Sequence, residues 1–313
     1  MSALWAPFGF LDVRNEAEPL VLPPEWFVPA GSHAEWWHAF ERNANEISNN
    51  IWPWWDEVNR CWSKVGISMY DASSLALADV VICRELAGLL TTTAVSGGHS
   101  THLDCFRGED IDGLAAPSVY EYLKSTGVSA DFSAHAQEAG KRLESLTFAF
   151  KRRFRRPRPY NAALVLGLSK FPWEYAKSSL HASLISGHGA QGMLGIAAAW
   201  LLETAEARET SRARAMQLAV DFVDRRVMAG VHYPSDNFAS WVTVTRYTKH
   251  YALWARSQKL DALDFIESAI LQHSTVYALC RHAESRARFD HLSGWLARVF
   301  DEERAACSHA LDA

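Results

Sequence analysis

The chain has 313 residues, of which 49% are apolar and 21% charged, and its formal net charge is −5. This length suffices for one large core or two modest domains, and the composition is ordinary for a soluble globular protein. The net negative charge argues against nucleic acid as a partner, because proteins that bind nucleic acids carry a basic surface.

The first part of the chain, residues 1–64, is rich in tryptophan and proline. Eight of the 13 tryptophans fall within the first 62 residues. We expect an irregular segment with short helices that packs on a larger core; the alternative is that its rings wall a substrate cleft. The N-terminus lacks a basic region followed by an apolar one, so we predict no signal peptide.

From residue 73 onward, apolar residues recur at three- and four-residue spacing, which predicts helices. We expect helices over residues 73–92, 134–153, 189–208, 211–229 and 237–259, and a helical tract over 260–306. Loops are expected at 97–98 and 107–117. The stretch 75–95 is broken by charges and the stretch 190–202 is too short to span a bilayer. The sequence therefore predicts an all-α helical bundle with its core over 65–258 and C-terminal helices of the same domain over 259–313.

The five cysteines are scattered, odd in number and form no CxxC pair. They indicate reduced thiols in a cytoplasmic protein, and one disulfide pair among them is the alternative. The sequence leaves open whether the chain forms a homo-oligomer.

The first of three polar segments contains Lys151 and, seven residues later, Arg158. Seven residues make two helical turns, so the two cations can project to the same side. A solvated basic helix end is the alternative. The other arginines of this run are Arg156, whose role is ambiguous, and the expected surface charges Arg152, Arg153 and Arg155.

The second segment, Ser186-Gly187-His188, precedes an alanine-rich helix. A hydroxyl and backbone N–H groups at a helix N-terminus form a natural anion site. The tripeptide alone is weak evidence, because a near-match occurs at residues 96–99. We interpret His99 and His102 as loop residues without a role.

The third segment begins with Arg226 in the last turn of a predicted helix, with Gly230 as the cap. His232 follows, Pro234 can open the next helix, and Asp236 lies in its first turn. A carboxylate four residues after a histidine can orient the imidazole for acid–base work. A capping Asp beside a surface His is the alternative.

In this order and spacing the three segments, over about residues 151–236, resemble the superfamily of type 2 phosphatidic acid phosphatases and vanadium haloperoxidases. The resemblance implies a helical core. It also implies a metal-independent phosphatase without a cofactor, which acts on a small-molecule phosphate ester, either a monophosphate or a diphosphate. His188 would be the nucleophile that forms a phosphohistidine, and His232, oriented by Asp236, the general acid and base. The phosphoryl oxygens would be bound by Lys151, Arg158, Ser186, Gly187 and Arg226.

The chain departs from the family pattern at two positions. Ile185 stands where the family usually has proline, and Arg225 where it usually has serine. An inactive or repurposed member, either an anion-binding protein or a transferase, is therefore an alternative.

A second alternative is a haloperoxidase in which His188 ligates vanadate and His232 serves peroxide. His181, seven residues before His188, resembles a histidine of algal bromoperoxidases and favours this reading; the alternative is that His181 only caps or lines a loop. The strings at 156–160 and 230–236 are phosphatase-like. His181 and Arg156 are candidates to support the site residues without contacting the substrate. The aromatic N-terminus could shelter an aryl or prenyl leaving group.

Overall fold

The computed structural model of the chain describes residues 74–93, 101–108, 128–144, 146–147, 150–151, 156, 158–160, 163, 171–174, 183–249, 251 and 254–309. Within these residues the chain forms helices and no strand, which confirms the all-α prediction. The tryptophan-rich segment 1–64, the loop at 97–98, His99 and His181 lie outside the described residues.

Helix α10 (Gly187–Leu202) is the central helix of the bundle, and every residue in it except Leu202 is buried. Four helices pack against it: α7 (Ala130–Lys141), α11 (Ala205–Met228), α12 (Pro234–Thr248) and α13 (Arg256–His273). A Cβ added at Gly189 would lie 2.3 Å from a methyl group of Val223. Glycine at this position therefore allows α10 and α11 to approach closely.

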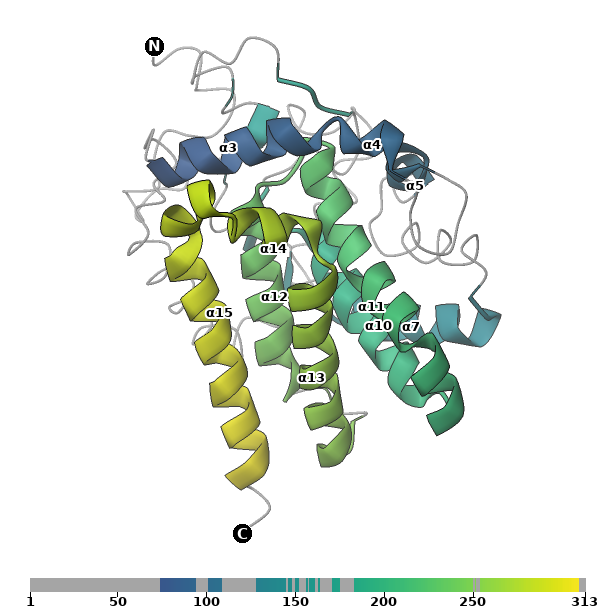
Figure 1. Ribbon diagram of the computed structural model, residues 1–313. Coiled ribbons are helices and arrows are strands. Elements are labelled where there is room, and N and C mark those ends of the chain that lie inside the picture. The colour runs from purple at the N-terminus through teal and green to yellow at the C-terminus, as the bar shows by residue number, and fades with distance from the viewer. Residues whose placement is uncertain are drawn as a thin grey trace, which may run out of the picture.

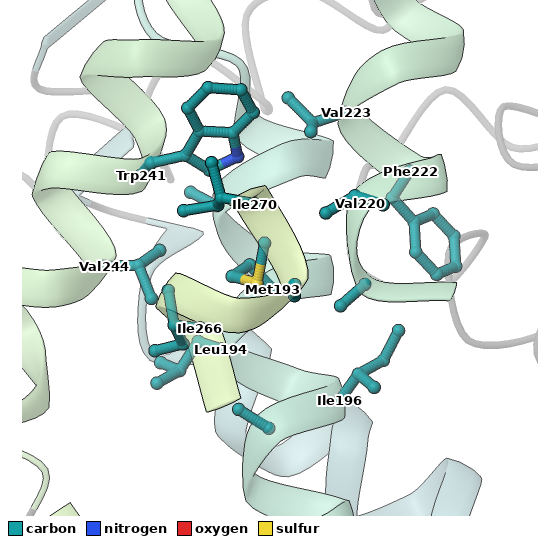
Figure 2. Packing of buried hydrophobic residues seen from close by; sticks show 14 of the residues in the cluster. Met193, Leu194, Ile196, Val220, Phe222, Val223, Trp241, Val244, Ile266 and Ile270 are labelled. Carbon is teal, nitrogen blue, oxygen red and sulfur yellow. The ribbon is translucent and has the colours of Figure 1, made fainter. Parts of the chain in front are cut away.

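Apolar side chains of α10, α11, α12 and α13 interdigitate in the core (Figure 2). Each such side chain contributes about 1.5–3 kcal/mol when it is fully buried. This core fixes the helix ends that carry the polar segments. The labelled residues, all without exposed surface, are Met193, Leu194, Ile196, Val220, Phe222, Val223, Trp241, Val244, Ile266 and Ile270.

The remaining helices are α3 (Ser74–Leu86), α4 (Leu89–Thr92), α5 (His102–Gly108), α14 (Thr275–Cys280) and α15 (Ala283–His309). Helix α15 runs beside α12 and α13. Helix α3 lies across one end of the bundle (Figure 1), where it contacts α11, α12 and α15. At this end α11 stops and α12 starts, so α3 covers the turn between them.

Two predicted helix boundaries around the core are wrong. The helix expected over 189–208 ends at Leu202, and α11 begins at Ala205 because the Thr204 hydroxyl accepts a hydrogen bond from the Ala207 N–H at 3.3 Å. The helix expected over 237–259 runs instead over Pro234–Thr248, and α13 starts at Arg256. The Gln258 side chain accepts from the Ala255 N–H at 2.9 Å and fixes this second start.

Other boundaries differ in the same way. The helix expected over 73–92 is divided into α3 and α4, and α7 begins at Ala130 and ends at Lys141 rather than extending over 134–153. The tract 260–306 is divided among α13, α14 and α15. Capping side chains, such as Ser129 before α7 and Ser274 before α14, set these breaks.

His102 is not a loop residue as predicted. It is the first residue of α5 and is buried, and Arg107 and Gly108 of the expected loop also belong to this helix. Burial, followed by the charge of Arg225, lowers the pKa of His102 to about 4. His102 is therefore neutral at physiological pH.

The cysteines Cys83, Cys105, Cys280 and Cys307 are buried thiols, and Cys61 lies outside the described residues. Over the ranges that the structure describes, no helix has both the length and the apolar character needed to cross a membrane.

Candidate functional site

The turn between α11 and α12 carries the third polar segment. Helix α11 ends at Met228, and Gly230 has a φ of 69°, a left-handed conformation that glycine adopts readily after a helix end. The N–H groups of Val231 and His232 both lie 3.2 Å from the Arg226 carbonyl oxygen. Pro234 then opens α12, as predicted.

The His232 imidazole is held at both of its nitrogens. Nδ1 lies 3.0 Å from Asp236 Oδ2, and Nε2 lies 2.8 Å from Arg158 Nη1. A guanidinium can only donate, so Nε2 accepts, and Nδ1 therefore carries the proton and donates to Asp236. The sequence predicted that Asp236 orients this imidazole, and the structure brings the two side chains into contact.

Three buried cations surround this histidine. Lys151 Nζ donates to the Ser183 carbonyl at 3.0 Å, and Arg158 Nη1 also donates to the Val231 carbonyl at 2.5 Å. The Arg226 guanidinium lies 4.3 Å from the ring centroid of Phe106 on α5. The pKa of Lys151 is lowered well below its ordinary value, first by burial and then by the charge of Arg158.

The same charges act on His232. Its pKa is lowered well below 6.5, first by burial and then by Arg158, Lys151, Arg226 and His188, in decreasing order. Residues of all three polar segments are therefore within electrostatic reach of one imidazole. An anion bound among the cations would raise this pKa again.

The start of α10 supplies the second polar segment. Ser186 is the N-cap, and its hydroxyl accepts from the Gly189 N–H at 3.4 Å. His188 is the second residue of the helix and is buried. The Ser240 hydroxyl on α12 lies 3.0 Å from the Ser186 carbonyl and 2.9 Å from the Asp236 carbonyl, which ties the starts of the two helices together. The N–H groups of a first helical turn suit an anion.

Arg156, whose role the sequence left ambiguous, lies behind Asp236. Its Nη1 donates to Asp236 Oδ1 and to Ser235 Oγ, both at 2.7 Å, and its Nη2 donates to Asp79 Oδ2 at 3.1 Å. The guanidinium stacks on the Tyr233 ring at 3.8 Å.

Asp79 comes from α3 and is fully buried, and the sequence patterns did not indicate it as a site residue. The available signal was its position as a carboxylate within the apolar stretch 75–95, because a buried charge needs a partner. Within the part of the chain that the structure describes, no group of three His, Cys, Asp or Glu residues could hold a metal ion.

Residues 142–257 match the model of the PAP2 superfamily. The match covers less than half of the chain and agrees with the superfamily that the three polar segments resemble. The matched segment contains Lys151, Asp236 and all the polar segments between them. The match supports a phosphatase-type or related activity at the level of the superfamily. No curated protein and no solved structure matches the chain.

The two departures within the PAP2 segment are both buried. Ile185 is part of the hydrophobic core next to the start of α10. Arg225 lies 3.5 Å from Asp221 and above the Phe222 ring at 5.2 Å, within helix α11. The arginine that replaces the family's serine is thus paired with a carboxylate one turn earlier on its own helix.

Proposed function

We propose that the chain is a phosphatase that hydrolyses a phosphate ester, either a monophosphate or a diphosphate, through a phosphohistidine on His188. The observation that carries this proposal is the double contact of His232. Asp236 holds its Nδ1 proton, which leaves Nε2 directed at Arg158. A histidine whose proton is held on Nδ1, beside three cations, suits proton transfer to a phosphoester. Binding of an anion alone would not require the His232–Asp236 pair.

The cations would hold the phosphoryl oxygens and neutralise the charge that develops in the transition state. Lys151, Arg158 and Arg226 provide three positive charges, and Ser186 and the Gly187 N–H add hydrogen bonds at the start of α10. Burial strengthens each of these interactions, because a low local dielectric weakens screening. The proposal requires no metal.

In the first step a ring nitrogen of His188 attacks phosphorus and the bond to the leaving oxygen breaks. His232 donates its Nε2 proton to that oxygen, so the alcohol departs neutral. In the second step His232 Nε2 takes a proton from water, the resulting hydroxide attacks the phosphohistidine, and the N–P bond breaks. Phosphate is released, His188 is restored and His232 is protonated for the next cycle.

The charge state of His232 follows the ligand. Without an anion, its pKa lies well below 6.5 because burial and the surrounding cations disfavour the imidazolium. A phosphate dianion offsets those cations, which raises the pKa and allows Nε2 to take up a proton. Substrate binding therefore creates the general acid that the first step needs.

The test is hydrolysis of p-nitrophenyl phosphate by protein treated with a chelator. We expect turnover that orthovanadate inhibits and that His188→Ala abolishes. His135→Ala, at an exposed position on α7, is the matched control and should leave turnover unchanged. Turnover retained in His188→Ala, or a folded wild-type protein without turnover, would contradict the proposal.

The haloperoxidase alternative relied on His181, which lies outside the described residues. The cations around His232 fit vanadate as they fit phosphate, because both are tetrahedral oxyanions; His188 would ligate the vanadium. Bound vanadate would supply peroxide-dependent halide oxidation. Bromide oxidation by the vanadate-loaded protein identifies this alternative, and phosphate binding without either activity identifies a non-hydrolytic member.

A further inference from the structure

Helix α3 lies outside the segment that matches the PAP2 superfamily, yet it contacts the turn that carries His232 and Asp236. Cys83 Sγ donates to the His232 carbonyl at 3.2 Å. Asp79, one helical turn earlier, accepts from the Ser235 N–H at 3.0 Å and from the Ser235 hydroxyl at 2.5 Å. Asp79 and Cys83 of α3 therefore accept or donate three hydrogen bonds to the turn that carries His232 and Asp236.

Asp79 also shares the Arg156 guanidinium with Asp236. Nη2 of Arg156 pairs with Asp79 at 3.1 Å and Nη1 with Asp236 at 2.7 Å, and both carboxylates are fully buried. Stacking on the Tyr233 ring fixes the plane of the guanidinium between them. One positive charge thus serves two carboxylates, which leaves this group with one net negative charge when both are ionised.

We propose that Asp79 is a positioning residue for the His232–Asp236 pair, acting through Arg156 and Ser235. The inference rests on the proposed function. With Asp79 ionised, Arg156 does not neutralise Asp236 fully, and the remaining negative charge stabilises the His232 imidazolium. With a neutral residue at position 79, the charges of Arg156 and Asp236 cancel, and the imidazolium loses that support.

A positioning role predicts that the effect of a variant depends on the leaving group, which simple loss of structure does not predict. Phenoxide is a poor leaving group and needs a proton from His232, whereas 2,4-dinitrophenoxide departs without one. Asp79→Asn should therefore lower kcat/KM for phenyl phosphate about tenfold or more and change it by less than about twofold for 2,4-dinitrophenyl phosphate.

Two further variants complete the comparison. Ser235→Ala removes the hydroxyl that contacts both Asp79 and Arg156, so it should show the same selectivity with a smaller loss. Asp224→Asn is the matched control, because Asp224 is a buried carboxylate that accepts instead from Ser274 and the Val276 N–H. Its effect on the two substrates should be equal. If Asp79→Asn does not fold, Ser235→Ala decides.

A second readout does not depend on turnover. The His232 Nδ1 proton, assigned in NMR spectra by its loss in His232→Gln, should move to higher field in Asp79→Asn because its bond to Asp236 weakens. An inactive wild-type protein would contradict the proposed function, and the Nδ1 resonance would still test the link to Asp79. An unchanged resonance, or equal losses for the two substrates in an active enzyme, would overturn the inference.

Discussion

Nη1 of Arg158 lies 2.8 Å from Nε2 of His232, so the nitrogen that would serve the substrate accepts a hydrogen bond from a cation. In this arrangement His232 is neutral, and its proton is on the opposite nitrogen, facing Asp236 at 3.0 Å. An incoming anion must replace this contact. Binding and protonation of the imidazole are therefore coupled.

This coupling predicts proton uptake on anion binding. Sulfate is a suitable probe because it remains a dianion at neutral pH, so any proton taken up goes to the protein. Calorimetric titration with saturating sulfate at pH 7, in buffers of different ionisation enthalpy, should report uptake of about one proton. His232→Asn should bind sulfate with no uptake. Equal uptake in this variant would assign the proton to another group.

Asp236→Asn should lower kcat for phenyl phosphate by about 100-fold. The amide cannot stabilise an imidazolium. The substitution also removes one of the two carboxylates, Asp79 and Asp236, that pair with Arg156. Steady-state kinetics measure the loss, and circular dichroism checks the fold. A loss below about threefold would show that the carboxylate does not support the proton transfer.

The pH dependence of activity should contain a contribution from Asp79. Burial raises the pKa of Asp79 to about 6, against the opposing charge of Arg156. As the pH falls through about 6, Asp79 takes up a proton and the cluster loses one negative charge. Among the described residues, the groups that face Asp79 are Arg156, Ser235 and Asp236, with Cys83, Tyr233 and Cys280 within electrostatic reach.

The measurement compares wild type with Asp79→Asn on phenyl phosphate between pH 5 and 8. The ratio of their kcat/KM values should be largest above pH 6 and should fall toward one below it, because wild-type Asp79 is then neutral too. A ratio that does not change with pH would show that the charge of Asp79 does not support the proton transfer by His232.

Gly230→Ala should destabilise the protein. The residue has a φ of 69°, and an added Cβ would lie 2.7 Å from the Pro172 carbonyl oxygen and 2.8 Å from the Phe171 ring. The left-handed conformation alone costs about 1–2 kcal/mol, and the contacts add to it. Urea unfolding should show this loss in the free energy of unfolding.

Gly88→Ala is the control for this change. Gly88 has a φ of −64°, and no atom of the described residues lies within 4 Å of an added Cβ. Alanine there should be neutral or stabilise by about 0.4–1 kcal/mol. Equal effects of the two substitutions would mean that the turn before His232 does not need its left-handed glycine.

Local patterns predicted much of the site. His232 and Asp236 are four residues apart across a helix start. Glycine marks the end of α11 and proline the start of α12, so the sequence itself indicates their contact. Asp79 could not be found in this way, because its contact with Ser235 spans 156 residues and depends on how α3 crosses the bundle. The helix ends at Leu202 and Thr248 were missed because neither glycine nor proline marks them.

A phosphohistidine on His188 can be observed directly by trapping the covalent intermediate in the His232→Asn variant. With 2,4-dinitrophenyl phosphate the first step needs no acid, whereas the second still needs His232 as a base, so the phosphoenzyme should accumulate. After an alkaline quench, mass spectrometry of the peptides should locate the phosphate on His188. Phosphate on another residue, or no covalent phosphate while the wild type turns over, would contradict the account.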